Sequence, residues 1–190
     1  GFPQVVVVKN PTCHGEHGDY STIYENCIVN ETLPSLAFGY KGCSSKWKIT
    51  PQNAYCNTWA PAVECWARGG KVTKYIGYDN GPKDSKRCVD FSEDKQYVYE
   101  YPLRGWGWDR EECQRQILAA GLPLPVKSAC FFCPSTQPSE LRAMVTEHPE
   151  LCDQIITMEQ LAKNTKLHRP LEIQGLWGNG VKGFRGATPK

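Results

Sequence analysis

The chain has 190 residues, of which 40% are hydrophobic and 22% charged, the composition of one folded domain with a real core rather than a disordered chain. Its formal net charge of +2 gives no bulk electrostatic reason to expect a nucleic-acid partner. The longest strongly apolar run, Val5 to Val8, is far too short to cross a bilayer, and no secretory signal pattern opens the sequence, so we expect no membrane partner. Because the sequence opens at Gly1, we expect the chain to be processed or to begin partway through a larger protein.

Ten cysteines are a high count for a chain of this length. They are Cys13, Cys27, Cys43, Cys56, Cys65, Cys88, Cys113, Cys130, Cys133 and Cys152. Their irregular spacing favours reduced thiols in a cytoplasmic protein over a secreted disulfide framework. We expect a subset to bind metal and several others to be buried as small hydrophobic residues.

The N-terminal third is predicted to begin with a strand. Val5 to Val8 is a continuous β-branched run, typical of a central parallel strand that is buried on both faces. A polar loop over 12–20 follows, and then a short helix over about 21–30, which Thr22 and Glu25 open as a capping box. The inward face of this helix is predicted to carry Ile23, Cys27 and Ile28.

The middle third is predicted to alternate helices with strands. A turn over 39–45 precedes a helix that starts at Thr50-Pro51, reaches about Trp59, restarts after Pro61 and stops at Gly69-Gly70. Its predicted inward residues are Trp59, Val63 and Trp66. Strands are predicted over 71–78, with Tyr75 among its packed residues, and over 96–103, with a polar loop over 77–86 after the first.

The C-terminal third is predicted to be helical. Asp109 and Glu112 form a capping box for a helix that ends near Ala120, with Gly121 as its C′ residue and Cys113, Ile117 and Leu118 as its core stripe. Further helices are predicted over 138–147 and 149–163, and an irregular segment over the last ~20 residues. Strands that alternate with helices indicate an α/β layered fold.

Cys130-Phe131-Phe132-Cys133, followed by Pro134, is the strongest chemical signal in the chain. Two thiols at this spacing bind one metal ion or iron–sulfur cluster, or form a redox disulfide. Because such metals require three or four ligands, we predict Cys43 as the third and Cys113 as a weaker candidate for the fourth. The alternative is a pair of unligated loop thiols.

A second cysteine and histidine cluster lies near the N-terminus. Cys13, His14 and His17 are residue types that bind zinc, but their spacing matches no strong zinc motif. The alternative that we favour is a polar loop.

Candidate nucleotide- and phosphate-binding residues are Lys46, Lys48, Asp79, Lys86 and Arg87. The two lysines at 46 and 48 follow Cys43, where their charge would favour thiolate formation, stabilise an anionic cluster or bind phosphate. The other three follow a predicted strand, and ligands of open α/β sheets bind beyond the carboxyl ends of strands. The alternative for this loop is a solvated basic surface.

Charge is distributed unevenly along the chain. Residues 163–190 hold six basic residues against one acid, for +5, which leaves −3 on residues 1–162. This basic tail would contact the phosphates of a nucleic acid, or it is a solvated, mobile end.

Several stretches match a known family in order. Within residues 101–134 these are Tyr101-Pro102-Leu103, Trp106-Gly107-Trp108-Asp109, and Cys130-Phe131-Phe132-Cys133-Pro134. Upstream they are Leu33-Pro34-Ser35-Leu36, Cys43 with Lys46-Trp47-Lys48, and Ile76-Gly77-Tyr78-Asp79. On these residues the chain resembles the phosphoadenosine phosphosulfate reductase-like family in its phage and bacterial form. The resemblance covers about residues 1–160.

The resemblance implies an adenine nucleotide alpha-hydrolase-like fold, related to the ATP pyrophosphatases. That fold is a three-layer α/β sandwich with a mostly parallel sheet, here expected over residues 1–134, with C-terminal helices over 135–165 and the basic irregular tail over 166–190. Family members that carry a [4Fe–4S] cluster ligate it with a tandem Cys pair and a later CxxC. The pair corresponds here to Gly42-Cys43, so Cys43, Cys130 and Cys133 are the matched ligands. Either one iron is open, or a fourth ligand comes from elsewhere, or the metal is zinc.

The family's phosphate-binding PP-loop would precede residue 1, and binding of ATP or a sulfonucleotide depends on its being supplied. The mobile catalytic Cys of the reductases has no counterpart after Cys152. We therefore predict an enzyme of nucleotide-activated sulfur transfer or reduction, with nucleic-acid modification as one form. Sulfonucleotide reduction proper and a non-catalytic accessory protein with a structural metal are the alternatives, and the chain can form an oligomer under any of these hypotheses.

Overall fold

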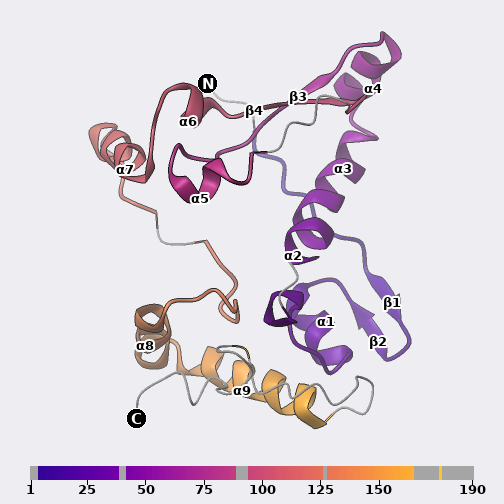
Figure 1. Ribbon diagram of the computed structural model, residues 1–190. Coiled ribbons are helices and arrows are strands. Elements are labelled where there is room, and N and C mark those ends of the chain that lie inside the picture. The colour runs from indigo at the N-terminus through magenta and orange to yellow at the C-terminus, as the bar shows by residue number, and fades with distance from the viewer. Residues whose placement is uncertain (1–3, 39–41, 89–93, 126–127, 165–175, 177–190) are drawn as a thin grey trace. The chain divides into compact units, whose positions relative to one another are not determined.

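The computed structural model describes residues 4–38, 42–88, 94–125, 128–164 and 176 (Figure 1). The chain divides into two compact units, which we describe separately. Unit 1 comprises residues 1–55 and 129–190, and unit 2 comprises residues 56–128. Among the described residues, no helix is both long enough and apolar enough to cross a membrane.

The N-terminal segment of unit 1 differs from the prediction. Residues 5–8 form no strand, and Val5 is 84% exposed, because a central strand requires partners on both sides and the described residues provide none. The predicted loop over 12–20 instead contains an antiparallel hairpin of β1 (Cys13–Gly15) and β2 (Gly18–Tyr20). Gly18 has a φ of 136°, a conformation that glycine adopts without steric cost.

Helix α1 (Ile23–Val29) follows the hairpin and confirms its capping box. The Thr22 side chain accepts from the Glu25 N–H at 3.1 Å, and the Glu25 carboxylate accepts from the Thr22 N–H at 3.1 Å. Cys27 is buried, with Ile23 and Ile28 packed against the same core, as predicted. A short 3-10 helix, η1 (Ser35–Phe38), comes next.

A helical run carries the chain from Gly42 to Cys56, where the sequence predicted a turn and a separate helix. It consists of α2 (Gly42–Ser44), the π-helix η2 (Ser45–Ile49) and α3 (Thr50–Cys56). Thr50, where we predicted a helix to start, is itself helical and continues the run from η2. Pro51 explains the π-helix, because its ring displaces the backbone of the preceding turn and the Thr50 N–H bonds to Ser45 O instead.

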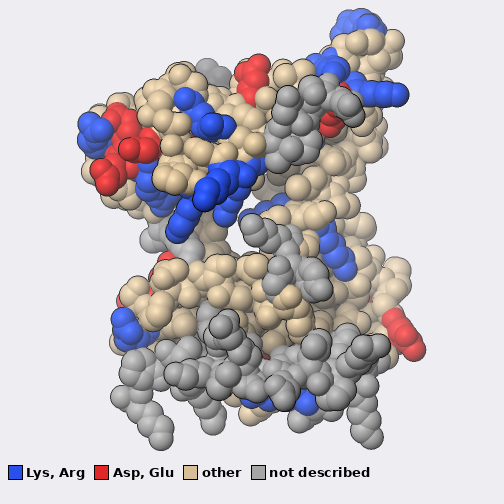
Figure 2. Space-filling view, viewed as in Figure 1, with Lys and Arg blue, Asp and Glu red and all other residues tan. Residues whose placement is uncertain are grey.

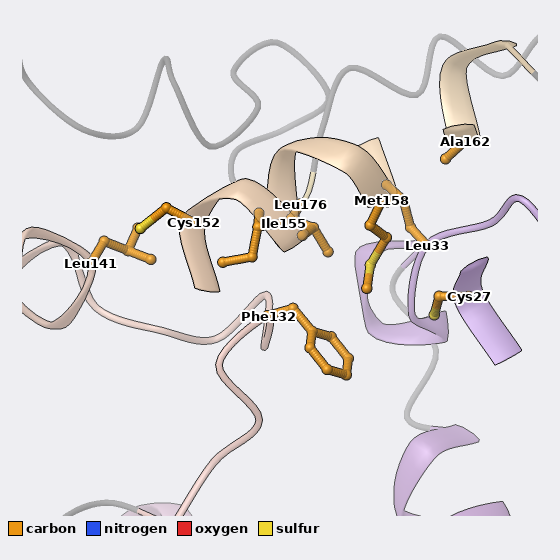
Figure 3. Close-up of a cluster of buried hydrophobic side chains, with 9 residues drawn as sticks. All are labelled: Cys27, Leu33, Phe132, Leu141, Cys152, Ile155, Met158, Ala162 and Leu176. Carbon is orange, nitrogen blue, oxygen red and sulfur yellow. The ribbon is translucent and has the colours of Figure 1, made fainter. Parts of the chain in front are cut away.

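The core of unit 1 forms on α9 (Pro149–Asn164), with α8 (Pro138–Glu147) packed beside it; both helices match their predictions. Side chains from five segments meet there (Figure 3). The buried members are Cys27, Leu33, Phe132, Leu141, Cys152, Ile155, Met158, Ala162 and Leu176. The Leu176 N–H donates to the buried Glu159 carboxylate at 2.8 Å, which fixes this residue on α9.

Unit 2 contains a two-stranded parallel sheet of β3 (Val72–Tyr75) and β4 (Tyr97–Glu100), with Val72 opposite Tyr97. Both strands were predicted, but Tyr75 is 71% exposed rather than packed. Helix α4 (Ala60–Ala67) precedes β3 and ends at Gly69, whose φ of 76° confirms the predicted stop. The Trp66 indole donates to Gln96 O at 2.8 Å, which ties α4 to the start of β4.

The predicted inward face of α4 is wrong in two of its three residues. Trp59 and Val63 are 42% and 43% exposed, and the buried residue is Ala62. Trp66 does face inward, against Tyr97, with ring centroids 5.6 Å apart. The small Ala62 side chain lets the helix pack closely, and the large residues lie at its margins.

The described residues of unit 2 also form helices α5 (Pro82–Ser85), α6 (Pro102–Gly105) and α7 (Arg110–Ala119). Asp109 caps α7 by accepting from the Glu112 N–H at 2.9 Å, and Gly121 has the predicted positive φ of 72°. The Glu112 carboxylate accepts from the Gln116 amide at 2.7 Å instead of completing the capping box. No residue of α7 is buried, and Leu118 is 57% exposed, so the predicted core stripe is wrong.

The protein is therefore a mixed α/β structure. Its described strands form two sheets of two strands each, one antiparallel and one parallel. The extended, mostly parallel sheet of a three-layer sandwich is not present among the described residues. Of the predicted basic tail over 166–190, only Leu176 lies within them.

Replacing Leu141 with Ala tests the core of unit 1. Leu141 is 1% exposed, and the truncation should lower the free energy of unfolding by about 2–5 kcal/mol. Val145→Ala on the same helix is the matched control, because Val145 is 44% exposed and should change the value by no more than about 0.5 kcal/mol. Urea unfolding followed by circular dichroism measures both, and equal effects would contradict the packing of α8.

The Asp94 carboxylate fixes the start of β4, and its ionisation makes the stability of this region depend on pH. Its carboxylate accepts from the Gln96 and Tyr97 N–H groups at 2.9 and 3.0 Å and from the Tyr99 hydroxyl at 3.0 Å. The bond from Gln96 is the largest cause of a lowered Asp94 pKa. This stabilisation is present above the unfolded-state pKa of about 4 and is lost as the pH falls through the lowered folded-state value.

Asp94→Ala should therefore lower the free energy of unfolding by about 1 kcal/mol at neutral pH, because solvent screens this exposed group. The difference from the wild type should shrink at acidic pH. Glu64→Ala, which removes an exposed carboxylate from α4, is the control. Urea titrations at several pH values measure the effect, and a difference that is independent of pH would refute this role of the carboxylate.

Candidate metal centre

The CxxC segment is a tight turn anchored by its two aromatic residues. The Cys133 N–H donates to Cys130 O at 3.0 Å, which closes the turn, and the Thr136 N–H donates to Cys133 O at 3.0 Å. The Phe131 and Phe132 rings meet edge to face with centroids 4.8 Å apart. Phe132 is 4% exposed and anchors the turn in the core on α9. Of the two cysteines, Cys130 is exposed and Cys133 is half-buried.

Helix α1 packs directly on this turn through Tyr24. The Tyr24 ring lies 5.7 Å from the Phe131 ring and 5.9 Å from the Phe132 ring, measured between centroids. Aromatic pairs at these distances each contribute about 0.5–1.5 kcal/mol beyond their buried area. The packing fixes the position of α1 relative to the two cysteines of the turn.

The thiol of Cys130 has both other predicted ligands as electrostatic neighbours. Its pKa is raised first by burial of the thiol, then by Cys133, and further by Cys43, whereas the Lys48 ammonium acts in the opposite direction. Cys43 of α2 is thus an electrostatic neighbour of the CxxC turn, although the two segments lie far apart in sequence. Among the described residues, no three cysteine, histidine or acidic side chains converge as closely as metal coordination requires. Binding would therefore require the α2 segment and the CxxC turn to close around the metal.

Cys43 lies on α2 rather than in the glycine-flanked turn that we predicted; residues 39–41 of that turn are outside the described residues. The preceding Gly42 packs against η1. A Cβ atom at position 42 would lie 3.1 Å from the Ser35 Oγ, so a larger residue there would displace that side chain. This close approach holds α2, and with it Cys43, against η1.

The two lysines after Cys43 have different surroundings. Lys46 Nζ lies 3.4 Å from the Tyr20 hydroxyl. It also lies 4.9 Å from the centroid of the Tyr20 ring and 5.0 Å from that of the Trp47 ring. It therefore joins η2 to the β hairpin through cation–π contacts. Lys48 acts on the Cys130 thiol and is the cation that favours its thiolate form.

Sequence reasoning assigned Cys27 only to the core and did not foresee its proximity to the CxxC. Its thiol is 1% exposed, and burial followed by the charge of Cys130 raises its pKa to about 12. Helical spacing alone could have placed Cys27 on the same face as Tyr24. No sequence signal indicates that this face packs against the CxxC turn.

The other predicted residues, Cys113, Asp79, Lys86 and Arg87, lie in unit 2. The Cys113 thiol on α7 has Asp79 and Asp109 as electrostatic neighbours, and burial is the first cause of its raised pKa. Asp79 Oδ1 accepts from the Gly81 N–H at 2.8 Å and so shapes the turn that begins α5.

Basic side chains gather around α5, whereas acidic and basic side chains alternate over α7 (Figure 2). Lys83, Lys86 and Arg87 are exposed there, and the Arg87 guanidinium pairs with Asp84 at 2.9 Å. The loop that follows β3 and contains α5 therefore carries exposed lysine and arginine side chains, the types that bind phosphate.

The N-terminal cysteine and histidine cluster forms the β hairpin. His14 Nδ1 lies 2.9 Å from Asp19 Oδ1 across the hairpin, and Cys13 Sγ is 3.8 Å from Pro11 O. The side chains of Cys13 and His14 therefore contact groups of the hairpin and of the segment just before it. All ten cysteines lie among the described residues, and no two of them form a disulfide.

Comparison of the chain with models of protein families, with curated proteins and with solved structures finds no match.

Thiol alkylation tests the packing of this centre. In the folded protein, iodoacetamide at neutral pH should leave Cys27 unmodified, because the thiol is 1% exposed and its pKa is raised to about 12. Unfolding in urea should make it as reactive as other cysteines. Mass spectrometry of tryptic peptides measures the modification, and rapid labelling of Cys27 in the folded state would show that α1 is not packed on the CxxC turn.

Proposed function

We propose that this protein binds a metal through Cys43, Cys130 and Cys133, most favourably as a [4Fe–4S] cluster, and acts in nucleotide-activated sulfur transfer or reduction. The observation that carries the proposal is the closed CxxC turn, in which the Cys133 N–H donates to Cys130 O at 3.0 Å. Cys43 of α2 is an electrostatic neighbour of the Cys130 thiol. Thiolate sulfur is the ligand that iron–sulfur clusters and structural zinc share, and zinc is therefore the alternative metal.

The residues around the three cysteines suit such a site. Phe131, Phe132 and Tyr24 form an apolar wall beneath the turn that would exclude water. Lys48 supplies positive charge that offsets the negative charge of thiolates. When bound, the cluster would supply sulfur or electrons to an acceptor.

ATP or a sulfonucleotide is the proposed source of activation. Lys86 and Arg87 around α5 would bind phosphate, with Asp79 holding the loop after β3 in its turn. ATP would activate an acceptor oxygen as an adenylate. Lys46 and Lys48 of unit 1 are separate candidates for binding phosphate. A nucleic acid that contacts the basic tail is the proposed acceptor.

Two alternatives lead to different measurements. A sulfonucleotide reductase would convert adenylyl sulfate or its 3′-phosphorylated form to sulfite with a thiol reductant, and ATP would have no role. An accessory protein would hold a structural metal and turn over neither compound. Release of pyrophosphate from ATP by the full chain, with and without nucleic acid, separates the sulfur-transfer proposal from both.

Cys43→Ala tests the metal site itself. The anaerobically purified wild type should be brown, with absorbance near about 400 nm from thiolate-bound iron, and the variant should lose most of its iron and this absorbance. Cys65→Ala is the control, because Cys65 lies on α4 in unit 2. Iron and sulfide analysis measures both. A variant that keeps full metal content would refute the site, and a colourless wild type with bound zinc would refute the cluster.

A further inference from the structure

The loops that follow β3 and β4 meet at one end of the parallel sheet of unit 2. Because the strands are parallel, their carboxyl ends lie at the same end of the sheet, and Figure 1 shows α5 and α6 there. The Ile76 N–H donates to Glu100 O at 2.9 Å, and the Asn80 N–H donates to Trp108 O at 2.8 Å. These bonds join the two loops into one surface, at the position where ligands of open parallel sheets bind.

Aromatic side chains of the two loops form two pairs. Tyr78, which follows β3, and Tyr101, which follows β4, are stacked, with ring centroids 5.9 Å apart and an angle of 13° between the ring planes. The Trp106 and Trp108 rings lie 5.0 Å apart between centroids, and Trp106 is 62% exposed. An indole with this exposure offers a face on which a planar base can stack.

Basic side chains of the α5 loop lie beside these rings. The Arg87 guanidinium lies 5.9 Å from the centroid of the Tyr78 ring. It also pairs with Asp84, the acidic residue of α5, at 2.9 Å. Lys83 and Lys86 are exposed, and Figure 2 shows basic side chains gathered around this helix. The surface therefore combines positive charge with exposed aromatic area.

We propose that this surface of unit 2 binds a single strand of nucleic acid, with a base stacked on Trp106 and phosphates held by the basic side chains of the α5 loop. Those side chains are Lys83, Lys86 and Arg87. Cations that contact the backbone and aromatic rings that stack bases are the two elements of single-strand binding without sequence preference. A duplex keeps its base faces inside its own stack, and a free nucleotide presents only one base.

This inference rests on the proposed phosphate-binding role of Lys86 and Arg87 and assigns that role to the backbone of the nucleic acid. It does not depend on the metal centre, because every residue that carries it lies in unit 2.

Fluorescence anisotropy of a labelled oligothymidylate of about 12 nucleotides, titrated with the full chain, tests the stacking. Trp106→Ala should weaken binding at least about fivefold, because stacking of one base contributes that factor or more. Trp106→Phe is the matched control, since it keeps an aromatic face and should retain most of the affinity. Equal affinity of the wild type and Trp106→Ala would overturn the inference.

The salt dependence of the same titration tests the phosphate contacts. Lys86→Ala should weaken binding and reduce the slope of log K against log salt concentration by about 0.7, the contribution of one phosphate contact to a single strand. Lys71→Ala is the control, because Lys71 is exposed and precedes β3, at the opposite end of the sheet from α5. Its affinity and slope should equal those of the wild type. Equal slopes for the wild type and Lys86→Ala would contradict the phosphate contact.

Three outcomes would assign the binding elsewhere and overturn the inference. A duplex that binds as tightly as the single strand would exclude base stacking. ATP that competes as well as unlabelled oligothymidylate would make the surface a nucleotide site. A Lys182→Ala, Arg185→Ala double variant that loses binding while Trp106→Ala and Lys86→Ala keep it would place the strand on the basic tail.

Circular dichroism shows whether each variant is folded, and the duplex comparison with Lys86→Ala decides the case if Trp106→Ala is not. The metal content of the wild type and of Cys43→Ala is measured separately, so failure of strand binding leaves the proposed metal site standing. Loss of the metal site likewise leaves the strand-binding surface standing.

Discussion

The candidate site depends on the packing of Tyr24 and Phe132 against the core of α9. Burial of one phenylalanine side chain contributes about 1.5–3 kcal/mol, and the two contacts of Tyr24 with the turn add about 0.5–1.5 kcal/mol each. This packing is sufficient to fix a short turn and a two-turn helix against each other. It is not sufficient to hold several thiolates together, because two unit charges 4 Å apart repel by about 4 kcal/mol near a protein surface.

Burial and the repulsion between thiolates together explain why the pKa values of the Cys27 and Cys130 thiols are raised. The pKa of the Cys27 thiol and that of the Cys130 thiol are both raised, with burial as the first cause, so the neutral form of each is favoured. Lys48 offsets only part of the cost of charging Cys130. A bound cation would supply the missing positive charge, so that metal binding and thiol deprotonation are coupled. The apolar wall that stabilises the fold would thereby make the proposed site selective for a ligand that can displace protons.

Local signals in the sequence predicted local structure well. Thr22, Asp109, Gly69 and Gly121 occupy their predicted cap positions, because a cap depends only on hydrogen bonds or backbone conformation within a few residues. Predictions that depended on partners distant in the sequence were wrong more often. Val5 to Val8 has the composition of a central strand, but composition does not provide the neighbouring strands. Trp59 and Leu118 are hydrophobic and lie on helices, yet packing left both exposed.

The same distinction between local and long-range determinants applies to the candidate site. The CxxC spacing is visible in the sequence, whereas the packing of Cys27 in the same core as Phe132 depends on which helix covers the turn. Tertiary contacts set these positions. The close approach of Gly42 to Ser35 holds the segment that carries Cys43, and Tyr24 orients the helix that carries Cys27. A metal held by α2 and the CxxC turn would close one long loop of the chain, from Cys43 to Cys130. Since this closure restricts the unfolded state, metal binding would stabilise unit 1 as well as supply its chemistry.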